Sequence, residues 1–195
     1  MDSNRTEQST SLPLRALGAM VLFLSGLFTS VSATEINPWV IVDTETRTLT
    51  VLQGATVLAR YDDIALGRGG VGITRRQGDG KTPVGIFHVA WVNRNSRFRL
   101  FFGLDFPNLD HAHRAYTAQL IDSGQFDAIK TAFERRETPP QDTPLGGFLG
   151  IHGIGDGSQR VHSQFNWTDG CVAVTNEQIL QLDQWVTVGT KVVIY

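Results

Sequence analysis

The sequence has little of several things that whole classes of protein require. Cys171 is the single cysteine among 195 residues, which excludes an internal disulfide and a cysteine-rich zinc finger. Lysine and arginine number 17 against 19 acidic residues, giving a formal net charge of −2. With no block of like charge, we expect no nucleic-acid partner. Hydrophobic residues make up 41% and charged residues 18% of the chain, ordinary proportions for one globular domain with a sizeable core.

Long hydrophobic runs are also lacking. The longest apolar stretch covers residues 16–31 and is interrupted by glycine, serine and threonine, whereas a membrane span needs ~20 apolar residues. Arginines precede the stretch, and the small-x-small sequence Val31-Ser32-Ala33 follows it. We therefore expect residues 1–33 to be a secretory signal peptide that exports residues 34–195 to the periplasm or beyond. A retained membrane anchor is the alternative, and without it we expect no membrane contact in the mature form.

Short β-branched runs separated by glycine or polar pairs predict strands joined by hairpins. These runs cover residues 39–43, 48–52, 55–59, 64–66, 85–91, 172–174 and 191–195. Helical spacing predicts two helices in the middle of the chain, over 112–121 after a cap at Asp110 and over 126–136. The fold class is therefore mainly β with α (α+β), with a helical insertion at about 92–145.

One further helix is predicted near the end of the chain. Asn176 is suited to cap it, and apolar residues recur on one face from Glu177 to about Val186. A glycine then precedes the last strand.

Two glycine-rich stretches match nucleotide-binding motifs only formally. Residues 67–72 read Gly-Arg-Gly-Gly-Val-Gly, but a loop-like sequence follows where a dinucleotide site needs a helix. Gly80-Lys81-Thr82 lacks the leading glycine of a P-loop and is followed by Pro83. Both stretches are better explained as turns between strands.

The residues most suggestive of chemistry lie in the last third of the chain. Thiol catalysis needs a thiolate, which a nearby imidazole generates by accepting the proton, and backbone N–H groups that face the oxyanion. Gly170 precedes Cys171 and permits a tight turn, and His152 precedes Gly153. A buried inert thiol and a structural histidine are the alternative that these residues alone leave open.

His162 raises the question of a metal site. His152, His162 and Cys171 would make a zinc site with one open position, but their intervals match no common ligand spacing. We expect no metal, and we place His162 at the lining of a cleft or at the surface.

The motif resembles the signature of the L,D-transpeptidase (YkuD-type) catalytic domain family. His152-Gly153, an interval, and then Thr-x-Gly-Cys-Val at 168–172 are similar to that family's His-x and Ser/Thr-His-Gly-Cys. The Gly-Asp-Gly-Lys-Thr-Pro-Val-Gly stretch at 78–85 resembles its Gly-Asp-x-x-Thr-Pro-x-Gly turn. The likeness covers about 39–91 and 146–195.

The chain departs from the usual family pattern at two places. Asp169 stands where the family has histidine before Gly-Cys, and Ala173 stands where it has arginine or asparagine. The resulting Thr-Asp-Gly-Cys-Val-Ala-Val looks like a subgroup of the family, so we interpret the departures as variation in substrate.

The resemblance implies a fold and an activity for residues 34–195. The fold would be a curved β-sandwich with helices at its margins. The activity would be that of a periplasmic enzyme of peptidoglycan stem peptides, in which Cys171 attacks the bond between the L-diamino acid and D-Ala. A thioester would form and pass to an amine acceptor, with His152 as the base and no metal or organic cofactor. Water as acceptor would give an L,D-carboxypeptidase or hydrolase, and a non-catalytic wall-binding module is the other alternative.

The resemblance also implies roles for the residues around the nucleophile. The N–H groups of Gly170 and Cys171 would bind the oxyanion, the carbonyl of Gly153 would orient the imidazole, and Thr168 would support the site with its hydroxyl. We expect His152 to bring the pKa of the thiol below the ~8.5 of a free cysteine.

Further candidates would contact the substrate. His162 and Asp169 are placed near the cleft, and Arg97 and Arg99 are suited to the carboxylates of a stem peptide. Since both arginines lie in the predicted insertion, we expect that insertion to be a lid or wall of the cleft and not part of the core.

Overall fold

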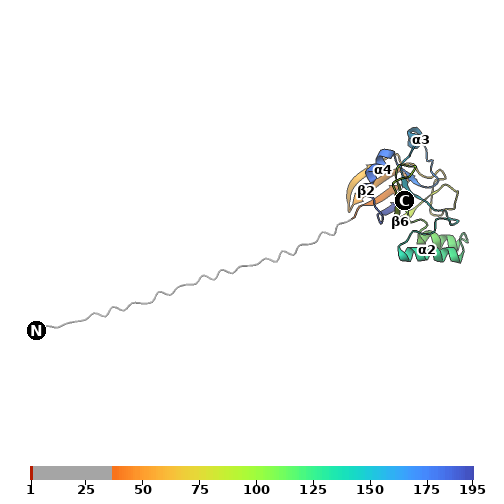
Figure 1. The fold of residues 1–195 in the computed structure, drawn as a ribbon, viewed down its shortest axis with the longest axis horizontal. Helices are drawn as coiled ribbons and strands as arrows, with labels where there is room; N and C mark the ends of the chain where they lie inside the picture. The colour runs from red at the N-terminus through yellow and green to blue at the C-terminus, as the bar shows by residue number, and fades with distance from the viewer. Residues whose placement is uncertain (2–36) are drawn as a thin grey trace. The chain divides into compact units, whose positions relative to one another are not determined.

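The computed structural model describes Met1 and residues 37–195, so the predicted signal peptide lies outside the described residues apart from Met1. The chain divides into two units, Met1–Thr34 and Glu35–Tyr195, and the second contains all the elements discussed below (Figure 1). Within the described residues, no helix combines the length and the apolar character that crossing a membrane would need.

The domain is built on an eight-stranded sheet with the order β3-β2-β1-β10-β6-β7-β8-β9. Its strands are β1 (Trp39–Asp43), β2 (Thr48–Gln53), β3 (Thr56–Tyr61), β6 (Gly85–Asn93), β7 (Phe101–Leu104), β8 (Gly150–His152), β9 (Val172–Ala173) and β10 (Lys191–Ile194). A separate parallel pair is formed by β4 (Val71–Gly72) and β5 (Thr82–Pro83). The fold class is therefore mainly β with some α, as the sequence predicts.

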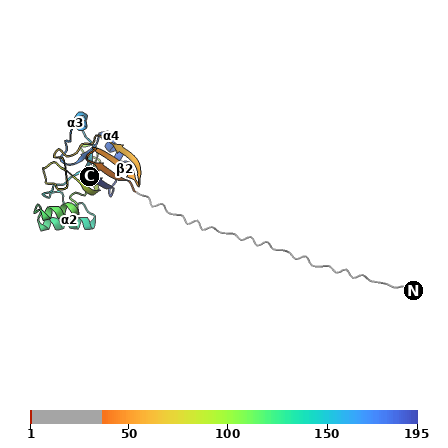
Figure 2. The ribbon, with the colours of Figure 1, turned by 180° about the vertical axis from the view of Figure 1, so that it is seen from behind.

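Four helices lie around the sheet in the described part of the chain. They are α1 (Leu109–Thr117), α2 (Ser123–Arg135), α3 (Gln159–Gln164) and α4 (Asn176–Leu182). Seen from front and back, α2 and α3 lie at opposite ends of the domain, with the sheet between them (Figure 1, Figure 2).

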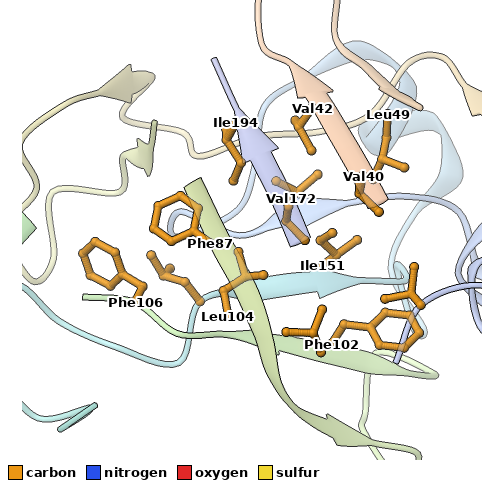
Figure 3. Packing of buried hydrophobic residues seen from close by; sticks show 14 of the residues in the cluster. Val40, Val42, Leu49, Phe87, Phe102, Leu104, Phe106, Ile151, Val172 and Ile194 are labelled. Atoms are coloured by element: carbon orange, nitrogen blue, oxygen red, sulfur yellow. The ribbon is translucent and has the colours of Figure 1, made fainter. Parts of the chain in front are cut away.

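Alternation along the central strands explains how the sheet acquires a core. In β1, Val40 and Val42 are fully buried while their neighbours are only partly so, which is the period-two pattern of a strand with one face covered. Residues from β1, β6, β7, β8, β9 and β10 converge on the same interior, with Phe87 and Phe102 among the largest (Figure 3). The candidate residue His152 lies in β8 and Cys171 directly precedes β9, and these two strands are anchored in the core by Ile151 and Val172.

The predicted helices exist, but their caps differ from those expected. α1 begins at Leu109 because the side chain of Asn108 accepts a hydrogen bond from the N–H of His111, so Asn108 and not Asp110 is the cap. α4 is capped by Thr175 and ends at Leu182, earlier than expected. Local spacing cannot separate adjacent polar residues that are all suited to capping.

The segment at 92–145 holds more than helices. β7 lies inside it and pairs with both β6 and β8, so the helical part is limited to residues 109–135. Phe102 of β7, Ala112 of α1 and Ile129 of α2 belong to the central hydrophobic cluster. The expectation that this segment stands outside the core is therefore wrong, because the apolar faces of its strand and helices complete the core.

Candidate active site

The parallel pairing of β8 with β9 brings the segment of His152 next to the turn that carries Cys171. Ile151 is in register with Val172, and both side chains point into the core. Because side chains alternate along a strand, His152 after Ile151 projects from the opposite face, while Cys171 directly precedes β9 and packs partly against the core. Gly150 lies beside Cys171 in this register and has no side chain to fill the space between them.

The imidazole of His152 is held in one orientation and kept dry. Its Nδ1 lies 2.7 Å from the carbonyl oxygen of Gly153, and since a carbonyl only accepts, Nδ1 carries the proton and Nε2 is free to take another. The rings of Phe98, Phe101 and Trp167 surround it, with centres 4.2, 5.8 and 5.9 Å away. The side chain is 2% exposed, and this burial lowers the pKa of His152 to about 4.

The thiol of Cys171, like the imidazole of His152, is uncharged at neutral pH. Sγ lies 3.7 Å from the carbonyl oxygen of Phe148, to which the S–H donates. Burial of the sulfur raises the pKa of Cys171 to about 11, although the backbone of Gly150 and the charge of Arg75 act in the opposite direction. Within residues 37–195 no hydrogen bond joins Sγ to the imidazole of His152. The pKa of Cys171 thus lies above the ~8.5 of a free cysteine, contrary to the expectation from the sequence, because desolvation outweighs the nearby groups.

The turn before the nucleophile is shaped by Thr168 and Gly170. The Thr168 hydroxyl donates to the carbonyl of Cys171 at 2.6 Å and accepts the N–H of Gly170 at 3.1 Å. Gly170 has φ +125°, and a Cβ there would lie 2.5 Å from the carbonyl oxygen of Lys81, so no other residue fits. Because the Gly170 N–H is occupied by Thr168, Cys171 supplies the better placed of the two N–H groups expected to face an oxyanion.

Asp169 takes part in the turn through its backbone. Its carboxylate is 79% exposed and lies 2.9 Å from the guanidinium of Arg68. Its carbonyl accepts a hydrogen bond from the Arg75 side chain at 2.8 Å. The carboxylate therefore points to solvent beside the nucleophile, in the place where the usual family pattern has an imidazole.

Arg75 is a component of the site that the sequence patterns do not reveal. It lies in the predicted loop after the glycine-rich stretch, where arginine is ordinarily a solvated residue. In the structure it is 6% exposed and its guanidinium reaches the loop that carries Cys171. No periodicity or motif marks it, since its partners come from distant parts of the chain.

The two candidate arginines of the insertion occupy different surroundings. The guanidinium of Arg97 lies 4.7 Å above the ring of Phe98, the aromatic residue stacked on His152. Arg97 borders a cavity of about 410 Å³, together with Asp156 and Trp167. Arg99 borders a neighbouring groove of about 420 Å³. Arg97 is thus linked to His152 through the ring of Phe98.

His162 is buried next to Trp167, which with Phe98 and Phe101 forms an aromatic wall around His152, and it does not lie at the surface. It is buried in α3, and its Nδ1 accepts a hydrogen bond from the indole N–H of Trp167 at 3.4 Å. Its Nε2 is buried without a hydrogen-bond partner among the described residues. In that part of the chain, no three His, Cys, Asp or Glu side chains are grouped as metal ligands would be.

The family model of the YkuD L,D-transpeptidase catalytic domain matches residues 37–194. The chain belongs to this family. A search of the curated proteins finds no match for this L,D-transpeptidase domain.

Solved structures support the fold of the L,D-transpeptidase domain. The helical cell shape determining protein Pgp2 from Campylobacter jejuni is 20% identical with a TM-score of 0.53, and the alignment covers 82% of this chain and 48% of that one. Bd1075 from Bdellovibrio bacteriovorus is 21% identical with a TM-score of 0.50, over 83% and 48% of the two chains. The chain thus spans about half the length of these structures. At such identities the likeness concerns the curled, mainly β fold.

Proposed function

We propose that this domain is a cysteine-dependent L,D-transpeptidase that acts on peptidoglycan stem peptides outside the cytoplasm. The observation that supports the proposal is the pairing of β8 with β9, which brings His152 next to the turn of Cys171 in a domain of the L,D-transpeptidase family. The expected export of the chain, from the pattern at residues 1–33, puts it in the compartment where this substrate lies.

The first half of the reaction forms a thioester. Sγ of Cys171 attacks the carbonyl at the L-centre of the diamino acid, and the thiol proton passes to Nε2 of His152. The carbonyl of Gly153 stabilises the resulting imidazolium by accepting its Nδ1–H. When the tetrahedral intermediate collapses, the imidazolium gives its proton to the departing nitrogen of D-Ala.

The second half transfers the acyl group. An acceptor amine loses a proton to Nε2 of His152 as it attacks the thioester carbonyl, and the thiol is restored when the imidazolium protonates the departing sulfur. Water in place of the amine would release the free tripeptide.

The resting protonation states indicate how the thiol must be activated. With the pKa of Cys171 raised to about 11 and that of His152 lowered to about 4, a neutral thiol beside a neutral imidazole is strongly favoured over the ion pair at rest. Proton transfer is therefore expected to accompany the formation of the carbon–sulfur bond, when charge also develops on the carbonyl oxygen and the backbone N–H of Cys171 stabilises it.

Two residues beside the pair are suited to hold the substrate. Phe148, whose carbonyl contacts Sγ, is 69% exposed and has φ +53°, a backbone conformation that is unfavourable for a bulky side chain. Its ring is therefore exposed to solvent, on a residue whose backbone contacts the thiol. Arg97 on the other side of His152 offers a guanidinium to a carboxylate of the stem peptide or the acceptor.

Incubation of the purified chain with a disaccharide-tetrapeptide tests the proposal. We expect intact-protein mass spectrometry to show a covalent adduct that lacks D-Ala, and product analysis to show a 3→3 crosslinked dimer. A tripeptide and free D-Ala alone would indicate an L,D-carboxypeptidase. Binding without an adduct or turnover would indicate a non-catalytic wall-binding module.

Cys171→Ala is the matched control, because Cys171 is the only cysteine in the chain. It should form no adduct with the tetrapeptide or with a carbapenem, an acylating β-lactam that serves as a second probe. Turnover by the Cys171→Ala protein would overturn the proposed mechanism. Loss of wild-type turnover on addition of a chelator would do the same, since it would point to a metal.

A further inference from the structure

The guanidinium of Arg75 joins three separate segments of the chain beneath the nucleophile. Its Nε donates to the carbonyl of Lys81 at 3.0 Å, one terminal nitrogen to Leu145 at 2.8 Å, and the other to Asp169 at 2.8 Å. These carbonyls belong to the loop after β4, the loop that leads to β8, and the turn before Cys171. One side chain therefore fixes the turn of the nucleophile to two other loops.

Two glycines leave the room that this guanidinium occupies. A Cβ at Gly146 would lie 2.5 Å from one terminal nitrogen of Arg75, and a Cβ at Gly170 would lie 3.2 Å from Nε and from the other terminal nitrogen. Both glycines have positive φ, +81° and +125°. The pocket is thus shaped to the planar fork of an arginine.

The positive charge of Arg75 is only weakly neutralised. Its three hydrogen-bond partners are neutral carbonyls, and the nearest carboxylate, that of Asp79, lies 3.9 Å from Nε. That carboxylate already accepts the backbone N–H groups of Arg76 and Lys81, each at 2.9 Å. A buried cation that is satisfied by carbonyls stabilises any negative charge that develops nearby.

We propose that Arg75 is a positioning residue of the nucleophile, which fixes the turn before Cys171 and places a positive charge against the developing thiolate. Asp169 opposes this charge, but its carboxylate is solvated and paired with Arg68. The imidazole of His152, in the neighbouring strand β8, is neutral before the reaction because burial lowers its pKa to about 4. The charge of Arg75 therefore partly offsets the rise in the pKa of Cys171 that burial of the thiol causes.

The proposal rests on Cys171 as the nucleophile of the proposed function, but alkylation tests it without peptidoglycan or turnover. Iodoacetamide and iodoacetate attack thiolates with the same leaving group and differ in charge. We compare their rates at pH 8 in the full chain, followed by intact mass, for wild type, Arg75→Gln and Arg75→Lys. Arg76→Gln removes the same charge from an exposed neighbouring side chain and is the matched control.

We expect Arg75→Gln to slow iodoacetamide about tenfold, the effect of one pKa unit from a lost opposite charge. The ratio of the iodoacetate rate to the iodoacetamide rate should also fall about threefold or more, which a purely structural role would not cause. Arg75→Lys should keep the ratio near the wild-type value while the melting temperature falls, because an ammonium cannot satisfy three carbonyls in the geometry of the fork. Arg76→Gln should change neither the ratio nor the melting temperature.

A folded Arg75→Gln protein with the wild-type ratio would overturn the proposal. If Arg75→Gln does not fold, Arg75→Lys decides: a retained ratio supports the role of the charge, and a threefold fall refutes it. Failure to form the tetrapeptide adduct with normal alkylation ratios would count against the proposed function and leave the role of Arg75 intact.

Discussion

The pH dependence of Cys171 alkylation in the free protein follows directly from the burial of the thiol. A pKa of about 11 leaves a thiolate fraction of about 10⁻⁴ at pH 7, whereas a free cysteine with a pKa of ~8.5 has about 3%. We therefore expect iodoacetamide to modify Cys171 about 300-fold more slowly than a free thiol at pH 7. The rate should rise about tenfold for each pH unit up to pH 10, without a plateau.

The measurement is a competition between Cys171 and a small thiol such as N-acetylcysteine in the same tube, read by mass spectrometry from pH 5 to pH 10. A second variant separates the resting state from the reaction. Because the imidazole of His152 is neutral and makes no hydrogen bond to Sγ, His152→Ala should change the alkylation rate less than about threefold. The same variant should slow acylation by a carbapenem about 10²–10⁴-fold, the usual contribution of a positioned base.

Two results would refute this reasoning. A rate plateau between pH 5 and pH 8, or alkylation as fast as that of the small thiol, would show a thiolate–imidazolium pair at rest. A large fall in alkylation by iodoacetamide in His152→Ala would show that the imidazole already holds the thiol proton in the free protein.

Further predictions concern the turn, the aromatic wall and acid stability. Asp169→Asn should keep most acylation activity, since the carboxylate is solvated, and a loss of several hundredfold would reveal a direct role. Arg97→Glu should raise KM more than it lowers kcat, and more than Arg99→Glu does; unchanged KM would remove Arg97 from substrate binding. Burial lowers the pKa of His111 to about 4. The free energy of unfolding should therefore be constant with respect to this group above pH 6.5, and it should fall by about 3 kcal/mol as the pH falls toward 4, because only the unfolded chain binds the proton in that range. His111→Gln should flatten this acid limb in thermal melts, and an unchanged limb would contradict the assignment.

The strands were predictable where the local pattern agrees with the tertiary structure. The alternation at 39–43 and 48–52 gives β1 and β2, and the run at 85–91 gives most of β6. β7 was not predictable, because Phe101–Leu104 is short, has no polar alternation and is stabilised by its two neighbouring strands.

Part of the candidate site was likewise predictable from the sequence, and part depends on the tertiary structure. Cys171 and His152 are marked by the adjacent glycines, which the local backbone requires, and the structure brings their two segments side by side. The neutral state of the thiol and the role of Arg75 could not be predicted from the sequence. Both arise from burial by loops far apart in the chain, and a single sequence contains no local signal of that burial.

The position of β10 in the sheet has a consequence for the order of folding. β10 lies between β1 and β6, so residues 191–194 join the β1–β3 part of the sheet to the β6–β9 part. Neither part can close the common core before this strand has been synthesised, so the nascent chain exposes apolar strand faces until then. A domain with this topology remains unfolded during most of its synthesis. We therefore expect the environment of the thiol to form only after this strand has paired with β1 and β6.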